Sequence, residues 1–176
     1  MIISRIISKF ANRICGLKIG LCMNDLFSYF EGPLDAFITE ALNTKDALIK
    51  RVIAKVTEGL VDDLKDIGII IDTTYKHTLD NSAIRHALKS HGSAKEVLRG
   101  QVPITDADFK IIPYIVSHYD SIATEKNRRG QDVIIYTKTL YGGVTVYVEE
   151  IRLGRHELAA STLYKRKKEN SPTQMD

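Results

Sequence analysis

The chain has 176 residues, enough for one domain or for a domain of about 100 residues with a helical partner. Its 44% hydrophobic and 27% charged content is typical of a soluble globular protein, and a net charge of +3 excludes a histone-like polycation. No apolar run approaches the roughly 18 residues of a transmembrane helix, so we expect no stable membrane insertion. Cys15 and Cys22 lack CxxC or zinc-ligand spacing, which favours reduced thiols in a cytosolic protein.

Residues 1–20 have the periodicity of an amphipathic helix with one basic face. Its apolar positions are Ile3, Ile7, Phe10, Ile14 and Leu17, and its basic positions are Arg5, Lys9 and Arg13. Three interpretations are open. The segment packs on the rest of the protein, touches a membrane surface or serves as a targeting peptide.

Two more helices are expected before residue 66. Pro33 suits a helix start, and apolar residues then line one face of residues 34–42. A second helix is expected over residues 45–64, where Leu48, Val52 and Leu60 share an apolar face. The β-branched residues 67–71 favour a short strand or an extended link. We therefore expect residues 1–72 to form a helical N-terminal region.

Between residues 80 and 113 we expect three short capped helices. Their caps are Asp80, Asn81 or Ser82 for the first, Ser93 with Glu96 for the second, and Thr105 with Asp108 for the third. Capping gives the carboxylates of this stretch a structural role.

The remainder favours β-structure. Residues 133–137 and 144–151 are β-branched runs around Tyr141-Gly142-Gly143, which predicts a hairpin. Residues 157–165 fit either a helix or a strand. The basic residues from Lys165 onward are expected to belong to a frayed tail, with residues 169–176 disordered.

Histidines mark the candidate chemistry. All five lie in the C-terminal 100 residues, and imidazole can give and take a proton near neutral pH. His86 and His91 are five residues apart, which turns them by about 140° on a helix and argues against a shared metal ion. Neither a metal site nor a cofactor motif is expected. Imidazole next to Arg and Lys points to acid–base chemistry on an anion such as phosphate.

Cations and hydroxyls on the expected sheet extend this interpretation. Lys138, Arg152 and Arg155 flank the hairpin strands, and three cations there suit a phosphodiester. Thr162 and Tyr164 alternate on the expected final strand and would share one face. A hydroxyl pair there could hold a phosphate or orient a ribose 2′-OH.

The order of several short motifs resembles a known family. HALKSHG, then EVLRGQVPIT, a helix containing Ile-Pro, a hairpin ending in YVEEIRLGRHEL and finally STLYKRK are similar to the phage-associated nuclease domains of the barnase–EndoU–colicin–RelE superfamily. The resemblance covers about residues 77–168. It implies an α+β fold with helices packed on a four- or five-stranded antiparallel sheet, in a nuclease-like domain over residues 73–168.

The resemblance also implies a metal-independent ribonuclease toxin, in which the ribose 2′-OH attacks its own phosphate to give a 2′,3′-cyclic phosphate. The implied catalytic residues are His86, His91, Lys138, Thr162 and Tyr164, and the implied substrate-binding residues are Arg99, Arg152 and Arg155. Which histidine is acid and which is base stays open. Implied partners are RNA, such as tRNA, and a cognate immunity or antitoxin protein. The expected site of action is the cytoplasm, with delivery from another cell or a phage as a further expectation.

Two other functions are open. The fold could serve as a non-catalytic, prophage-derived binding or structural module. It could also belong to an ADP-ribosyltransferase-type toxin, an interpretation favoured only by the adjacent acids Glu149 and Glu150.

Overall fold

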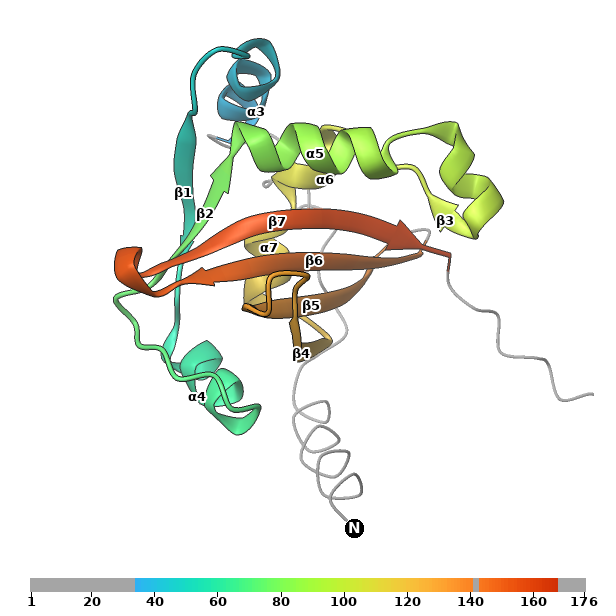
Figure 1. Cartoon of the computed structure of the whole chain (residues 1–176). Helices are drawn as coiled ribbons and strands as arrows, with labels where there is room; N and C mark the ends of the chain where they lie inside the picture. Colours follow the sequence, from blue (N-terminus) through green and yellow to red (C-terminus); the bar gives the residue numbers. More distant parts are fainter. Residues whose placement is uncertain (1–33, 141–142, 168–176) are drawn as a thin grey trace, which may run out of the picture.

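The computed structural model describes residues 34–140 and 143–167, which form an α+β fold around one mixed sheet (Figure 1). Along the sheet the strands are β1 (Lys50–Lys55), β2 (Lys76–Asp80), β7 (Glu157–Arg166), β6 (Gly143–Arg152), β5 (Asp132–Leu140) and β4 (Ser121–Lys126), with β3 (Gln101–Val102) also pairing with β7. The β2–β7 pair is parallel and the other pairs are antiparallel. The α+β class is confirmed, but the described sheet has seven strands rather than the four or five expected, and it is mixed rather than antiparallel.

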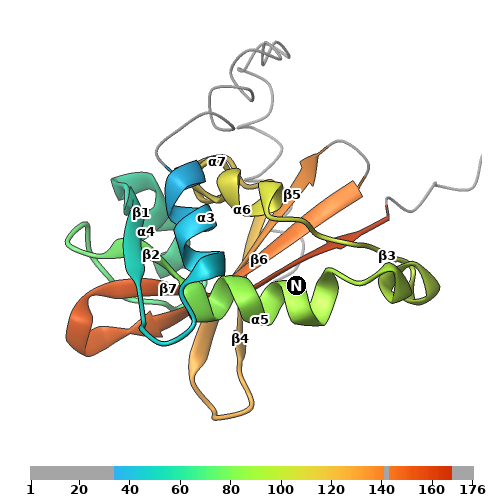
Figure 2. The ribbon, with the colours of Figure 1, turned by 90° about the horizontal axis from the view of Figure 1, so that it is seen from above.

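Short helices surround this sheet. They are α3 (Leu34–Asn43), α4 (Glu58–Asp66), α5 (Asn81–His91), α6 (Ala107–Lys110) and α7 (Ile112–Ser117), with 3₁₀ turns η1 (Ala94–Arg99) and η2 (Leu153–Arg155). Helix α5 runs alongside β7 (Figures 1 and 2). No helix in the described part of the chain is long and apolar enough to cross a membrane.

The helix expected over residues 45–64 is wrong. Residues 50–55 form β1, which pairs with β2, and α4 begins only after Thr57, whose side chain accepts a hydrogen bond from the Leu60 N–H at 3.3 Å. Leu48 and Val52, expected inside, are exposed. The same residues fit both the apolar spacing of a helix and the β-branched composition of a strand. Pairing with β2 makes this segment a strand. Since β1 lies in the sheet, residues 50–55 are part of the α+β fold and not of a separate helical region.

Of the other expected elements, a helix and a hairpin are confirmed, whereas the start of the expected tail is strand. Helix α5 is confirmed, with Asp80 as the cap that accepts from the Ala83 N–H at 2.8 Å, and β5 and β6 form the expected hairpin. Residues 157–165 are strand, and β7 continues through Arg166, so Lys165 and Arg166 are not a frayed tail. The predictions for residues 1–33, including both cysteines, and for 168–176 lie outside the described residues.

One face of the sheet packs against α6 and α7. Tyr136, Tyr147 and Leu163 are paired across β5, β6 and β7, are almost fully buried, and belong to the same core as Phe109 and Ile112 of those helices. Residues paired across neighbouring strands share a face. This side of the sheet is therefore the core face.

A β-bulge in β7 changes which residues point to that face. Val148 pairs with Thr162 but Glu149 pairs with Ala160, so Ser161 is an extra residue. Before the bulge, Ala160 faces the core beside Glu149; after it, Leu163 does. Tyr164 consequently points to the opposite face.

Candidate functional site: a basic pocket around His91

His91 is the last residue of α5 and lies beside Tyr164, near the end of β7. The helix stops at Gly92, and the His91 carbonyl oxygen accepts a hydrogen bond from the Ile104 N–H at 2.9 Å. This bond satisfies one of the carbonyls that a helix end leaves free. The His91 ring, 22% exposed, is thereby fixed at the edge of a pocket.

Glu96 lies beneath His91 rather than capping η1. Ser93 does cap this turn, accepting from the Lys95 N–H at 3.2 Å, but the Glu96 side chain turns inward and is only 3% exposed. Its Oε2 lies 3.3 Å from His91 Nδ1, and its Oε1 accepts from Arg99 Nη1 at 3.0 Å. The capping-box interpretation of Glu96 is therefore wrong, because the carboxylate binds two cationic or polar side chains instead of the backbone.

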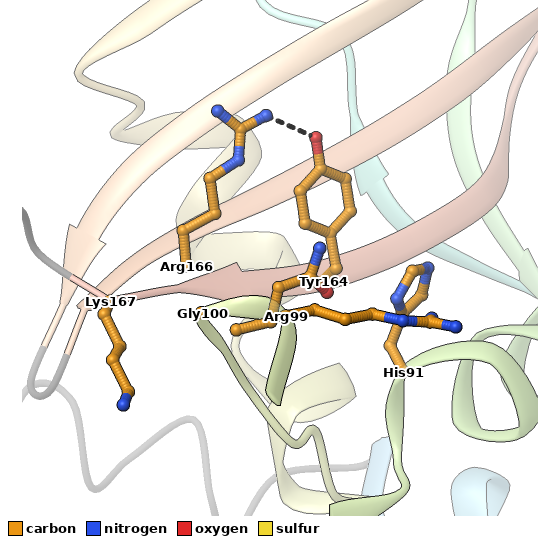
Figure 3. A pocket seen from close by; sticks show the side chains of 7 residues that line it. His91, Arg99, Gly100, Tyr164, Arg166 and Lys167 are labelled. Carbon is orange, nitrogen blue, oxygen red and sulfur yellow. Dashed lines mark hydrogen bonds between the residues drawn. The ribbon is translucent and has the colours of Figure 1, made fainter. Parts of the chain in front are cut away.

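Strand β7 supplies the second wall of the pocket. The Tyr164 ring lies 5.4 Å from the His91 ring, centroid to centroid, with the planes tilted by 35°. Arg166 Nη2 donates a hydrogen bond of 2.8 Å to Tyr164 Oη (Figure 3). The bulge at Ser161 is what brings both side chains to this face.

The third wall is the turn after η1. Gly100 adopts a left-handed conformation with φ of 72°, which suits glycine, and its carbonyl accepts from the Lys167 N–H at 3.3 Å. Together with the β3–β7 pairing, this bond joins the turn to the end of β7. The pocket is open to solvent and has a volume of about 680 Å³. Its lining residues are His91, Arg99, Gly100, Gln101, Tyr164, Arg166 and Lys167 (Figure 3).

The pocket is suited to a phosphate group. Arg99, Arg166 and Lys167 bring three positive charges, and none of the lining residues is acidic. Because the Tyr164 oxygen accepts from Arg166, its own hydrogen is free to be donated to a ligand. With His91 as a group that can take a proton, the pocket combines anion binding with acid–base chemistry.

Of the residues predicted from sequence, the structure brings His91, Arg99 and Tyr164 together. Thr162 lies two residues before Tyr164 on the same face of β7. Its hydroxyl oxygen is buried and has no hydrogen-bond partner among the residues that the structure describes.

Lys138 lies elsewhere, on the core face. It pairs with Thr145, which pairs with Lys165, and it sits 5.7 Å from the Tyr114 ring centroid. Its Nζ donates to Asp120 Oδ1 at 2.7 Å. Partial burial raises the pKa of the Asp120 carboxyl, but hydrogen bonds from Lys138 and the Thr139 N–H outweigh it, so the pKa is lowered overall.

The other predicted residues are also apart from the pocket. Arg152 and Arg155 lie at the far end of the β6–β7 pair. Strand β7 rises through nine residue steps from Glu157 to Arg166, which corresponds to about 30 Å at 3.3 Å per residue. His86 is exposed on α5, turned about 140° from His91 by the five-residue step.

Five pocket or supporting residues escaped sequence reasoning: Glu96, Gly100, Gln101, Arg166 and Lys167. Glu96 was hidden because its spacing from Ser93 also fits a capping box. Arg166 and Lys167 stand in a run of basic residues that looks like a solvated tail. The alternation Thr162, Tyr164, Arg166 is the signal that could have placed Arg166 beside Tyr164.

A second histidine–carboxylate pair lies inside the core. His77 Nδ1 lies 2.9 Å from Glu149 Oε2, both side chains are almost fully buried, and Tyr147 Oη donates to Glu149 Oε1 at 2.9 Å. Burial, and then the nearby Glu149 carboxylate, raise the pKa values of Tyr136 and Tyr147 well above 10. Within residues 34–140 and 143–167, no three His, Cys, Asp or Glu side chains gather as a metal site would require.

Comparison with known proteins places the chain in a nuclease family. The profile of the phage-Barnase-EndoU-ColicinE5/D-RelE like nuclease3 family matches residues 54–171, from the end of β1 past the end of β7. Searches of curated proteins and of solved structures gave no match. The matched residues include the whole His91 pocket, and the chain belongs to this family of phage-associated nucleases.

Proposed function

We propose that the protein is a metal-independent endoribonuclease toxin that cuts RNA, such as tRNA, in the His91 pocket. The observation that carries this proposal is a histidine placed beside three cations and a tyrosine hydroxyl in a member of a nuclease family. Phosphoryl transfer of this kind needs a base, an acid and positive charge around the phosphate. The pocket supplies side chains for each of these roles.

In the proposed reaction, His91 Nε2 takes the proton from the ribose 2′-OH. The 2′-oxygen then forms a bond to its own phosphorus while the bond from phosphorus to the 5′-oxygen breaks. Arg99, Arg166 and Lys167 balance the charge that builds on the phosphate oxygens, and the Tyr164 hydroxyl donates to the departing 5′-oxygen. The products are a 2′,3′-cyclic phosphate and a 5′-hydroxyl.

An RNA cleavage assay tests this function. Purified protein is incubated in EDTA with total RNA, with tRNA and with DNA of the same sequence as one RNA substrate. We expect RNA fragments ending in 2′,3′-cyclic phosphate and no cleavage of DNA or of RNA carrying a 2′-deoxyribose at the cut site. RNA that stays intact, or cleavage that needs a divalent metal, contradicts the proposal.

The same assay separates the other functions. A docking module would bind partners and leave RNA intact. An ADP-ribosyltransferase would transfer label from NAD, and the full burial of Glu149 beside His77 and Tyr147 makes that carboxylate inaccessible to such a substrate. Glu150, on the other face of β6, is only partly exposed.

An active ribonuclease would attack the RNA of the cell that makes it. We therefore propose that its site of action is the cytoplasm and that a cognate immunity or antitoxin protein restrains it. Expression should be toxic, and the His91→Ala variant should not be. Equal toxicity of both proteins would mean that growth arrest does not come from this pocket.

A further inference from the structure

Glu96 is the buried carboxylate that lies between His91 and Arg99. Its two oxygens are both engaged, one with His91 Nδ1 at 3.3 Å and the other with Arg99 Nη1 at 3.0 Å, while its side chain is 3% exposed. An ionised carboxylate can only accept hydrogen bonds. The proton in the His91–Glu96 bond therefore belongs to Nδ1.

We propose that Glu96 is a positioning residue that selects the tautomer of the neutral His91 ring, with the proton on Nδ1 and the lone pair on Nε2. A neutral imidazole carries one proton, so holding it on Nδ1 leaves Nε2 as the acceptor. This inference rests on the proposed ribonuclease function, in which Nε2 takes the 2′-OH proton. It assigns no direct contact between Glu96 and RNA, because the carboxylate lies beneath His91 and Arg99.

Arg99 makes the arrangement directional. A guanidinium has only donors, so it requires an acceptor on Glu96 and keeps one carboxylate oxygen occupied. The remaining oxygen faces His91 and can only accept. Arg99 and His91 thus both donate hydrogen bonds to the Glu96 carboxylate between them. These bonds hold the imidazole ring against rotation.

The sharpest test is Glu96→Gln, which keeps the size of the side chain. Arg99 will hold the amide oxygen, so the amide NH₂ will meet His91 Nδ1 and will force that nitrogen to accept. The ring proton then moves to Nε2, where it blocks the base. We expect ¹⁵N chemical shifts of the His91 ring, measured on the free protein, to change from the Nδ1–H to the Nε2–H pattern. We expect kcat to fall on the order of 100-fold with a much smaller change in KM.

Two further variants keep the inference falsifiable. In Glu96→Gln/Arg99→Ala, the amide is free to turn its oxygen to His91, so the Nδ1–H pattern should return although a second pocket residue is lost. In Glu96→Leu, no acceptor remains and the Nε2–H pattern should dominate. Glu125→Gln, an exposed acid on β4, is the matched control and should leave both the spectrum and kcat unchanged.

The outcomes are distinct from those of the RNA assay. If RNA is cut but the ¹⁵N pattern of His91 is the same in wild type and Glu96→Gln, Glu96 does not position the ring. A large loss of kcat with an unchanged pattern would make Glu96 itself the base, and would overturn the inference. If wild type shows the expected pattern but leaves RNA intact, the ribonuclease function fails while the geometric role of Glu96 stands.

Discussion

Lys138 and Tyr164 project from opposite faces of the same sheet. Lys138 shares the core face with Lys165 through the paired residue Thr145, whereas Tyr164 points to the face of the His91 pocket. A side chain on one face of a sheet cannot reach a phosphate held on the other. Lys138 thus has a different chemical setting from the residues that line the pocket.

This separation predicts unequal effects on cleavage. His91→Ala should lower kcat by about 10²- to 10⁴-fold, the usual contribution of a general base, while Lys138→Met should lower it by no more than a few-fold. Initial rates on a fluorescent RNA measure both, at a temperature where circular dichroism shows each variant folded. A loss in Lys138→Met as large as in His91→Ala would return Lys138 to the catalytic residues.

Cations of the pocket should control salt dependence. In Arg166→Gln and Lys167→Gln, binding of a non-cleavable 2′-deoxy-substituted RNA should weaken, and the slope of log Kd against log salt should shrink by roughly 0.7 for each lost phosphate contact. Fluorescence anisotropy at several salt concentrations gives the slope. Arg155→Gln is the control, since this exposed residue lies at the far end of β7. An equal change in that variant would place RNA along the whole strand.

The buried His77–Glu149 pair should dominate stability. His77→Leu removes the His77 hydrogen bond from the fully buried Glu149 carboxylate, and we expect a loss of about 3–5 kcal/mol in the free energy of unfolding. Urea unfolding measures it. Lys126→Ala breaks the exposed Lys126–Asp132 pair, with side chains 62% and 43% exposed, and should cost no more than about 1 kcal/mol. Similar losses in both variants would contradict the buried-pair interpretation.

Tyr136 and Tyr147 should make the protein sensitive to alkali. Burial raises their pKa values well above 10 in the folded state, so both stay protonated there while the unfolded chain releases protons near pH 10. Their contribution to stability is complete below pH 10 and is lost as pH rises above it. The urea concentration at the unfolding midpoint should decrease as the pH is raised from 9 to 11. This decrease should be smaller in Tyr136→Phe/Tyr147→Phe. An identical fall in both proteins would assign the alkaline loss to other groups.

The sequence correctly predicted those elements that depend only on residues close together in the chain. Asp80 caps α5, and β5 and β6 are consecutive strands that pair in register, so both features follow from neighbours in sequence. The helix prediction for residues 45–64 failed because β1 forms only through its pairing with β2, whose paired residues lie 21 to 30 positions further along the chain. A propensity for helix or strand cannot decide such a segment without its partner.

The candidate site around His91 was predicted from the sequence only in part, for a similar reason. His91, Arg99 and Tyr164 were found from residue type and motif order, and they do meet. Glu96 was assigned to a cap, and Lys138 to the active site, because sequence alone shows neither burial nor the face of a strand after a bulge. One extra residue in β7 reverses the alternation on which the placement of strand side chains depends.

The bulge also makes the pocket depend on chain length rather than on the identity of Ser161. Deletion of this single residue would restore uninterrupted alternation, turning Tyr164 and Arg166 into the apolar interior and Leu163 out toward the His91 pocket. Substitutions at this position would be tolerated far better than a one-residue deletion. The spacing of β7 thus matters to this pocket as much as the identity of the residues that line it.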